Sequence, residues 1–342
     1  MSGEHTNRPV HGTAAGDAYV ALPPTAVDAS ASGPTRLIVA WPGFDPPRTA
    51  TALAAAIPMT GVPVWRVYLD LPGRSPGGLG SGAILETENI EAYCVAVENA
   101  ARRLPDALAE IRRDLSIPDG PVGLAGFSAG GAAALLAVAQ GAVPVSTVAL
   151  VAPVVAPSRA ARAVEKRSGR ERAWTDQALA LAERLDLGSH AADIAGRHVP
   201  ALLIGGAKDR VVPTREITAL RDQLRRHGGS VESATFRMGH ALAAEPGTEP
   251  RPPITEAVRV DGVLTDWFRD HLADQAPRDT RAEAAAGATQ PVDVPRETAD
   301  PAGVPHSEAG VTQPVDTRHG SWSPGGQETA PPRTGAGVGH RS

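Results

Sequence analysis

The chain has 342 residues, of which 42% are hydrophobic and 21% charged, so it can form one large globular domain or two average ones. Its 33 basic and 38 acidic residues give a net charge of −5, which leaves no polycationic surface and argues against nucleic-acid binding. A single cysteine, Cys94, excludes a disulfide framework and any site built from several thiolates, and we expect it to be a small buried apolar residue.

Targeting signals are not visible in the sequence. The N-terminal residues contain no basic segment followed by an apolar run, so we predict no secretory signal and a cytoplasmic location. No stretch approaches the roughly 18 apolar residues that a membrane-spanning helix needs, so we predict no membrane partner.

Along the chain, residues 1–16 are polar and are expected to form a flexible N-terminus. Residues 17–274 then alternate short apolar runs with longer stretches at helical spacing. The short runs predict strands at 18–22, 37–41, 64–69, 122–127, 147–152, 202–206 and 231–238. Helical spacing predicts helices at 49–57, 88–115, 129–140 and 214–226, and a closing helix with Val260, Leu264, Trp267 and Phe268 on its apolar face.

This alternation predicts an α/β protein with a mostly parallel sheet and helices on both faces. Residues 154–198 fall between two core strands, and we expect them to form a small cap insertion with a helix at 174–185. The first half of this insertion is basic, which predicts a solvated helix face or, alternatively, a surface that recognises an anionic substrate group. Residues 275–342 are rich in Ala, Gly and Pro and poor in large aliphatic residues, which predicts a disordered tail.

The nucleophile candidate is Ser128, in the sequence Gly126-Phe127-Ser128-Ala129-Gly130 between a predicted strand and a predicted helix. A Gly-x-Ser-x-Gly turn in this context is a nucleophile elbow, in which a sharp turn requires Gly126 and Gly130 and exposes the serine hydroxyl. Residues 73–77 fit the same letters around Ser75, but Pro76 has no N–H to offer an oxyanion and no helix begins there. We therefore interpret Ser75 as a turn residue.

A serine nucleophile needs a base, and the base needs a carboxylate that fixes its tautomer. Asp209 follows the predicted strand 202–206, and His240 follows the strand 231–238, so both lie just past a strand's C-terminal end. The chain order serine, acid, histidine is the order expected after an elbow. The alternatives are that Asp209 is an aspartate in a turn and that His240 is a histidine on the surface.

Two backbone N–H groups are candidates for an oxyanion hole. Ala129 begins the helix after the elbow, where its N–H is free of an intrahelical partner. Phe44 follows the strand 37–41 in the sequence Trp41-Pro42-Gly43-Phe44, and Gly43 allows the backbone to approach a substrate.

These residues resemble the α/β-hydrolase superfamily, in particular compact esterases of the dienelactone-hydrolase kind. The resemblance covers residues 17–274 and rests on the elbow around Ser128, the acid loop with Asp209 and the loop Gly239-His240. The early loop departs from the usual His-Gly-x pattern and reads Pro42-Gly43-Phe44. The resemblance implies that no metal or organic cofactor is needed.

We therefore predict a serine hydrolase that cleaves a small-molecule ester or thioester through an acyl-enzyme, with Ser128, His240 and Asp209 as its triad. A serine peptidase or amidase on the same fold is one alternative. A non-catalytic binding protein on this fold is another, although such a protein would be expected to lack one of the three side chains.

Overall fold

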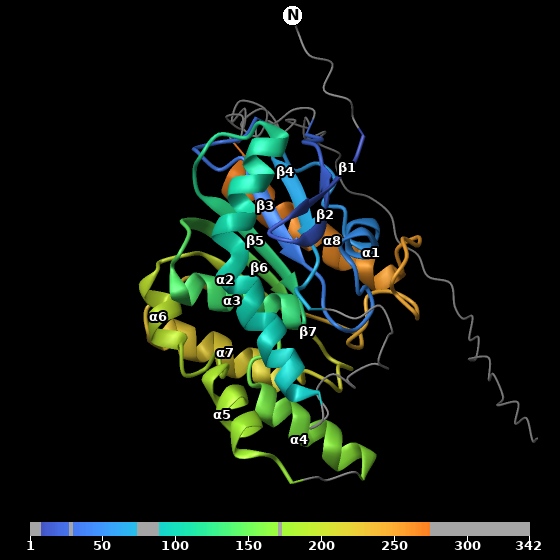
Figure 1. Ribbon diagram of the computed structural model, residues 1–342, viewed down its shortest axis with the longest axis vertical. Coiled ribbons are helices and arrows are strands. Elements are labelled where there is room, and N and C mark those ends of the chain that lie inside the picture. The colour runs from blue at the N-terminus through green and yellow to red at the C-terminus, as the bar shows by residue number, and fades with distance from the viewer. Residues whose placement is uncertain (1–7, 27–29, 74–88, 170–172, 274–342) are drawn as a thin grey trace, which may run out of the picture. The chain divides into compact units, whose positions relative to one another are not determined.

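The computed structural model describes residues 8–26, 30–73, 89–169 and 173–273, and its central feature is one eight-stranded sheet (Figure 1). The strand order is β1-β2-β4-β3-β5-β6-β7-β8, in which β2 pairs antiparallel with β1 and β4 and all other neighbours are parallel. The strands are β1 (Val10–Ala14), β2 (Asp17–Leu22), β3 (Leu37–Trp41), β4 (Trp65–Leu69), β5 (Val122–Phe127), β6 (Val145–Val151), β7 (Ala201–Gly206) and β8 (Val231–Phe236).

Helices cover both faces of the sheet, as predicted. Successive residues of a strand point to opposite faces, so Leu37 and Val39 of β3 belong to one apolar cluster and Ile38 and Ala40 to another. The first cluster packs beneath α2 (Ile90–Leu115), α3 (Ala129–Gln140), α5 (Asp176–Arg184), α6 (Ala191–Gly196) and α7 (Thr214–Arg226). The second packs beneath α1 (Ala50–Ala56) and α8 (Thr255–Leu272) (Figure 1). The four residues predicted to close the sheet are all buried on α8.

Part of the N-terminal segment forms a strand, whereas the sequence predicts a flexible N-terminus over residues 1–16. Residues 10–14 form β1, an edge strand that pairs with β2 through Val10–Ala21 to Ala14–Asp17. A Cβ on Gly12 would lie 2.6 Å from the end of the Tyr19 side chain, so a larger residue there would have to displace that side chain. The polar composition of this segment does not predict a strand, because an edge strand with one solvated face needs few apolar residues. Residues 1–7 and the predicted tail lie outside the described residues.

The segment between β6 and β7, predicted as the cap, carries α4 (Pro157–Ser168), α5 and α6. Both α4 and α5 contact α2. The basic side of α4 is partly neutralised within the protein, because Arg159 contacts Asp186 at 3.0 Å and Glu216 at 3.2 Å. Recognition of an anionic substrate by this segment remains a prediction.

The parallel strands determine where the candidate site lies. Because β3, β5, β7 and β8 run in the same direction, the loops that follow them gather at one edge of the sheet. These loops carry Asp45, Ser128, Asp209 and His240 respectively.

Candidate active site

Ser128 lies on the sharp turn between β5 and α3. Its backbone has φ 54° and ψ −114°, a left-handed conformation that a non-glycine residue adopts only when its surroundings impose it. Three backbone hydrogen bonds hold this turn. The Ser128 N–H donates to the Val151 carbonyl at 2.9 Å, and the Ser128 carbonyl accepts from the N–H groups of Ala132 at 3.1 Å and Val154 at 3.3 Å. The Ser128 side chain makes no capping hydrogen bond to α3, so its hydroxyl is directed elsewhere.

The glycines around Ser128 are required by close backbone contacts. A Cβ on Gly126 would collide with the backbone of Gly130, and a Cβ on Gly130 would collide with the carbonyl groups of Trp41 and Pro42. A Cβ on Gly43 would lie 2.8 Å from the Cβ of Ser128. The elbow therefore packs directly against the loop after β3, at the residue that precedes Phe44.

The structure brings together the three side chains predicted to form the triad. His240 Nε2 lies 2.9 Å from Ser128 Oγ, and His240 Nδ1 lies 2.7 Å from Asp209 Oδ2. All three side chains are buried, so these hydrogen bonds are shielded from competing water. The expectation that the elbow exposes the Ser128 hydroxyl is therefore not met, because His240 packs over it. The ring of His240 also packs against Phe127, with 5.3 Å between the ring centroids.

The orientation of the Asp209 carboxylate is fixed by the backbone. Its Oδ1 accepts hydrogen bonds from the N–H groups of Val211 and Val212, both at 2.8 Å, which leaves Oδ2 to accept from His240. The acid loop is also joined to the histidine loop, because the Lys208 N–H donates to the Met238 carbonyl at 3.0 Å. Asp209 is thus held at a defined distance from His240.

A second carboxylate, which the sequence analysis did not single out, faces the other nitrogen of His240. Asp45 Oδ2 lies 3.4 Å from His240 Nε2, and the Asp45 side chain is 2% exposed. Burial alone would lower the pKa of His240, but the hydrogen bonds and charges of Asp209 and Asp45 outweigh it and raise the pKa to about 9. The available signal was an acidic residue on the loop directly after β3, at the edge of the sheet that carries the triad.

The predicted oxyanion donors lie on the loop after β3 and at the start of α3. Ala129 is the first residue of α3, where a helix leaves N–H groups without intrahelical partners and carries a partial positive charge. Phe44 is half-buried, and its ring lies 6.1 Å from the ring of Tyr93 in α2. The binding of an oxyanion by these two N–H groups stays a prediction.

Ser75, the second Gly-x-Ser-x-Gly serine, lies outside the described residues. Cys94 is buried in α2, and burial raises the pKa of its thiol to about 12, as expected for an unreactive apolar residue.

In the described part of the chain, no three His, Cys, Asp or Glu side chains gather as metal ligands would. None of the described helices has the length and apolarity needed to cross a bilayer.

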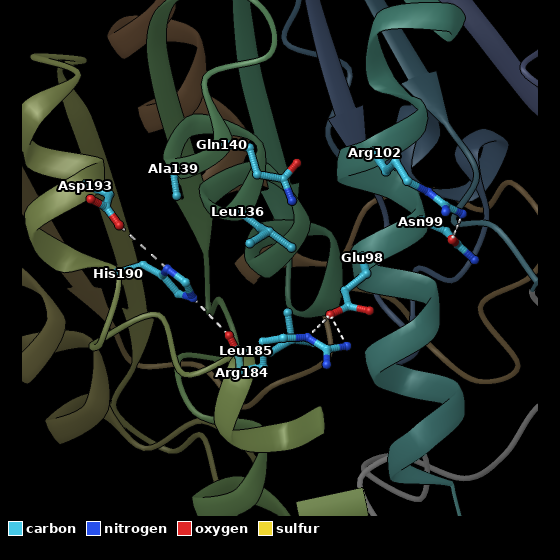
Figure 2. Close-up of a pocket in the computed structure, with 10 residues that line it drawn as sticks. All are labelled: Glu98, Asn99, Arg102, Leu136, Ala139, Gln140, Arg184, Leu185, His190 and Asp193. Carbon is cyan, nitrogen blue, oxygen red and sulfur yellow. Dashed lines mark hydrogen bonds and ion pairs between the residues drawn. The ribbon is translucent and has the colours of Figure 1, made fainter. Parts of the chain in front are cut away.

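A pocket of about 640 Å³ lies away from the triad, between α2, α3, α5 and α6 (Figure 2). Its lining includes Leu136 and Gln140 from the C-terminal half of α3, whereas Ser128 precedes the N-terminus of that helix. Arg184 and Glu98 form an ion pair across it at 2.7 Å (Figure 2). The pocket's polar side chains are therefore partly engaged with one another, and it is not the candidate active site.

Solved structures of other proteins resemble this chain over about three quarters of its length. The Thermus thermophilus protein TT1662 aligns at 22% identity with a TM-score of 0.53, over 76% of this chain and 98% of its own. A puromycin-hydrolyzing peptidase of Mycobacterium tuberculosis aligns at 18% identity and a TM-score of 0.53, over 78% of this chain and 40% of its own.

Pyrococcus horikoshii acylaminoacyl peptidase aligns at 15% identity and a TM-score of 0.51, over 78% of this chain and 42% of its own. The chain thus spans about two fifths of the length of these two peptidases. No protein-family model and no curated protein matches the sequence. The likeness to solved structures, together with the strand order and the elbow after β5, shows that this chain has the α/β-hydrolase fold.

Proposed function

We propose that this chain is a serine hydrolase that cleaves a carboxylic ester or thioester through an acyl-enzyme intermediate. The observation that carries the proposal is the hydrogen-bonded series from Ser128 Oγ to His240 Nε2 and from His240 Nδ1 to Asp209 Oδ2. A nucleophile, a base and an orienting acid in this geometry are the three groups that acyl transfer by a serine requires.

In the first half of the reaction, Ser128 Oγ attacks the carbonyl carbon of the substrate while its proton passes to His240 Nε2. Asp209 accepts the Nδ1–H hydrogen bond and stabilises the imidazolium that forms. The backbone N–H groups of Phe44 and Ala129 would donate to the oxyanion, and the N-terminus of α3 adds favourable electrostatics. The imidazolium then returns its proton to the leaving alcohol or thiol as the carbonyl re-forms.

In the second half, water attacks the carbonyl carbon of the acyl-enzyme. His240 Nε2 accepts a proton from this water, and the second tetrahedral intermediate collapses to release the carboxylic acid. Ser128 regains its proton from His240, which restores the starting state.

A serine peptidase or amidase would use the same triad, so the substrate class needs a direct experiment. We would assay the full chain with p-nitrophenyl esters and acyl thioesters of graded chain length and with aminoacyl p-nitroanilides. We expect turnover of an ester or thioester and a loss of at least about a thousandfold in kcat for Ser128→Ala. Ser75→Ala, which alters the second Gly-x-Ser-x-Gly match, should retain full activity.

The panel separates the candidate functions. Anilide turnover that exceeds ester turnover in kcat/KM would assign an amidase or peptidase. Ester turnover that survives Ser128→Ala would contradict the proposed nucleophile. A complete absence of turnover, together with no reaction of Ser128 with an organophosphorus probe, would favour a non-catalytic binding protein on this fold.

A further inference from the structure

Two carboxylates face the ring of His240 from opposite sides. Asp209, on the loop between β7 and α7, contacts Nδ1 at 2.7 Å, and Asp45, on the loop between β3 and α1, lies 3.4 Å from Nε2. Phe127 packs on the ring, and Ser128 Oγ lies 2.9 Å from the same Nε2 that faces Asp45. The triad mechanism uses Asp209 but assigns no role to Asp45.

The position of Asp45 is built into the fold by hydrogen bonds between its loop and the loop that carries His240. The Leu242 N–H donates to the Pro46 carbonyl at 2.9 Å, and the Arg48 N–H donates to the Gly247 carbonyl at 2.7 Å. The buried Arg48 guanidinium also joins the loops, because it donates to the carbonyls of Phe44 at 2.8 Å and Pro246 at 3.0 Å. These bonds flank Asp45 and hold it beside His240.

We propose that Asp45 is a positioning residue that holds His240 as an imidazolium in the resting enzyme by accepting a hydrogen bond from Nε2–H. The inference rests on the proposed function, since it concerns the same base. A carboxylate has no proton to offer when ionised, so a contact with Nε2 is favourable only when that nitrogen carries one. Burial on its own disfavours the imidazolium, but the carboxylates of Asp209 and Asp45 lie close enough to His240 to outweigh this effect.

This contact makes His240 a switch between a resting and an active state. The Nε2 proton must leave to solvent before Nε2 can accept the Ser128 proton, so attack requires the neutral imidazole. Because the pKa of His240 is raised to about 9, His240 is mostly protonated at pH 7. During acylation the Ser128 proton arrives at Nε2, and Asp45 again faces the imidazolium.

The test follows the reaction of Ser128 with a small fluorophosphonate, because this measures the base without knowledge of the natural substrate. The second-order rate constant of labelling is measured on the full chain from about pH 6 to about pH 10. We expect the wild-type rate to rise with pH to a plateau with a midpoint near 9. The rate at pH 7 should be about a hundredfold below the plateau.

Asp45→Asn removes the charge and keeps the shape of the side chain. We expect its midpoint to fall by at least about one pH unit, the smallest shift usual for an opposite charge at this distance, while the plateau changes by less than about tenfold. Asp45→Glu should restore an alkaline midpoint. Asp193→Asn is the matched control, because Asp193 forms a His–Asp contact with His190 at 3.9 Å outside the site.

The outcomes separate this inference from the proposed function. If wild-type Ser128 is not labelled at any pH, the proposed function fails. If Ser128 is labelled but the midpoint is the same in wild type and Asp45→Asn, the role of Asp45 is overturned. A wild-type midpoint near 7 also overturns it, and that measurement needs no variant. If Asp45→Asn does not fold by circular dichroism, Asp45→Ser must show the same downward shift.

Discussion

Asp209→Asn should nearly abolish activity through a change of tautomer. The backbone N–H groups of Val211 and Val212 both donate to Oδ1, so the asparagine must place its carbonyl oxygen there. Its NH₂ group then faces His240 Nδ1 in place of the acceptor Oδ2. Nδ1 must become the acceptor, which moves the single proton of the neutral imidazole to Nε2. In that tautomer Nε2 donates toward Ser128 and cannot accept its proton.

The expected loss in kcat is on the order of 10⁴, the size seen for the same change in other triads, and corresponds to about 5 kcal/mol in activation free energy. The assay is kcat for the best substrate of the ester panel over the full pH range. A full profile is needed because loss of the carboxylate also lowers the pKa of His240.

A matched control is Asp186→Asn, since Asp186 also caps a turn, by accepting the Gly188 N–H at 2.9 Å, but lies outside the triad. It should retain wild-type kcat. If Asp209→Asn keeps kcat within about tenfold of wild type, with an unchanged circular dichroism spectrum, Asp209 does not hold the base and the reasoning is refuted.

Three further predictions concern stability. Gly130→Ala should lower the free energy of unfolding, measured in urea, by at least about 2 kcal/mol, because the new Cβ would collide with the Trp41 carbonyl. The control Gly262→Ala lies in α8 with open space around it and should raise the free energy of unfolding by up to about 1 kcal/mol. The free-energy difference between wild type and His240→Gln should be largest below about pH 6.5 and shrink as pH rises through about 9, because the folded state binds that proton more tightly. A chain ending at Asp274 should keep its melting temperature and kcat/KM, since residues 275–342 are too poor in apolar side chains to offset their ordering entropy; a drop in either would contradict the boundary.

Most of the sheet could be predicted from sequence because its strands are buried on both faces. The runs at 37–41 and 122–127 have the bounds of β3 and β5, since Pro42 ends the first run and Pro121 precedes the second. The edge strand β1 was missed because its pairing with β2 depends on backbone hydrogen bonds more than on apolar side chains. Helix α6, a single short element in the cap, has too few turns to show a period.

The predicted triad residues lie together because each follows a parallel strand, so their proximity depends on topology that alternating patterns reveal. Asp45 lies at the same edge, yet its contact with His240 depends on how two irregular loops pack. That packing is fixed by the Arg48 side chain and by backbone bonds between Pro46 and Leu242. No periodicity encodes such contacts, so one sequence could place Asp45 near the site but not beside Nε2.

The central claim is that Ser128 is an activated nucleophile, and peptide mapping after reaction with a fluorophosphonate tests it most directly. The full chain is incubated with the probe above pH 9, where His240 is largely neutral, and then digested and analysed by mass spectrometry. We predict one stoichiometric phosphonyl adduct, located on Ser128. No adduct should form when the Ser128→Ala variant is treated with the same probe. An adduct on Ser75, or an unmodified Ser128 under these conditions, would contradict the account.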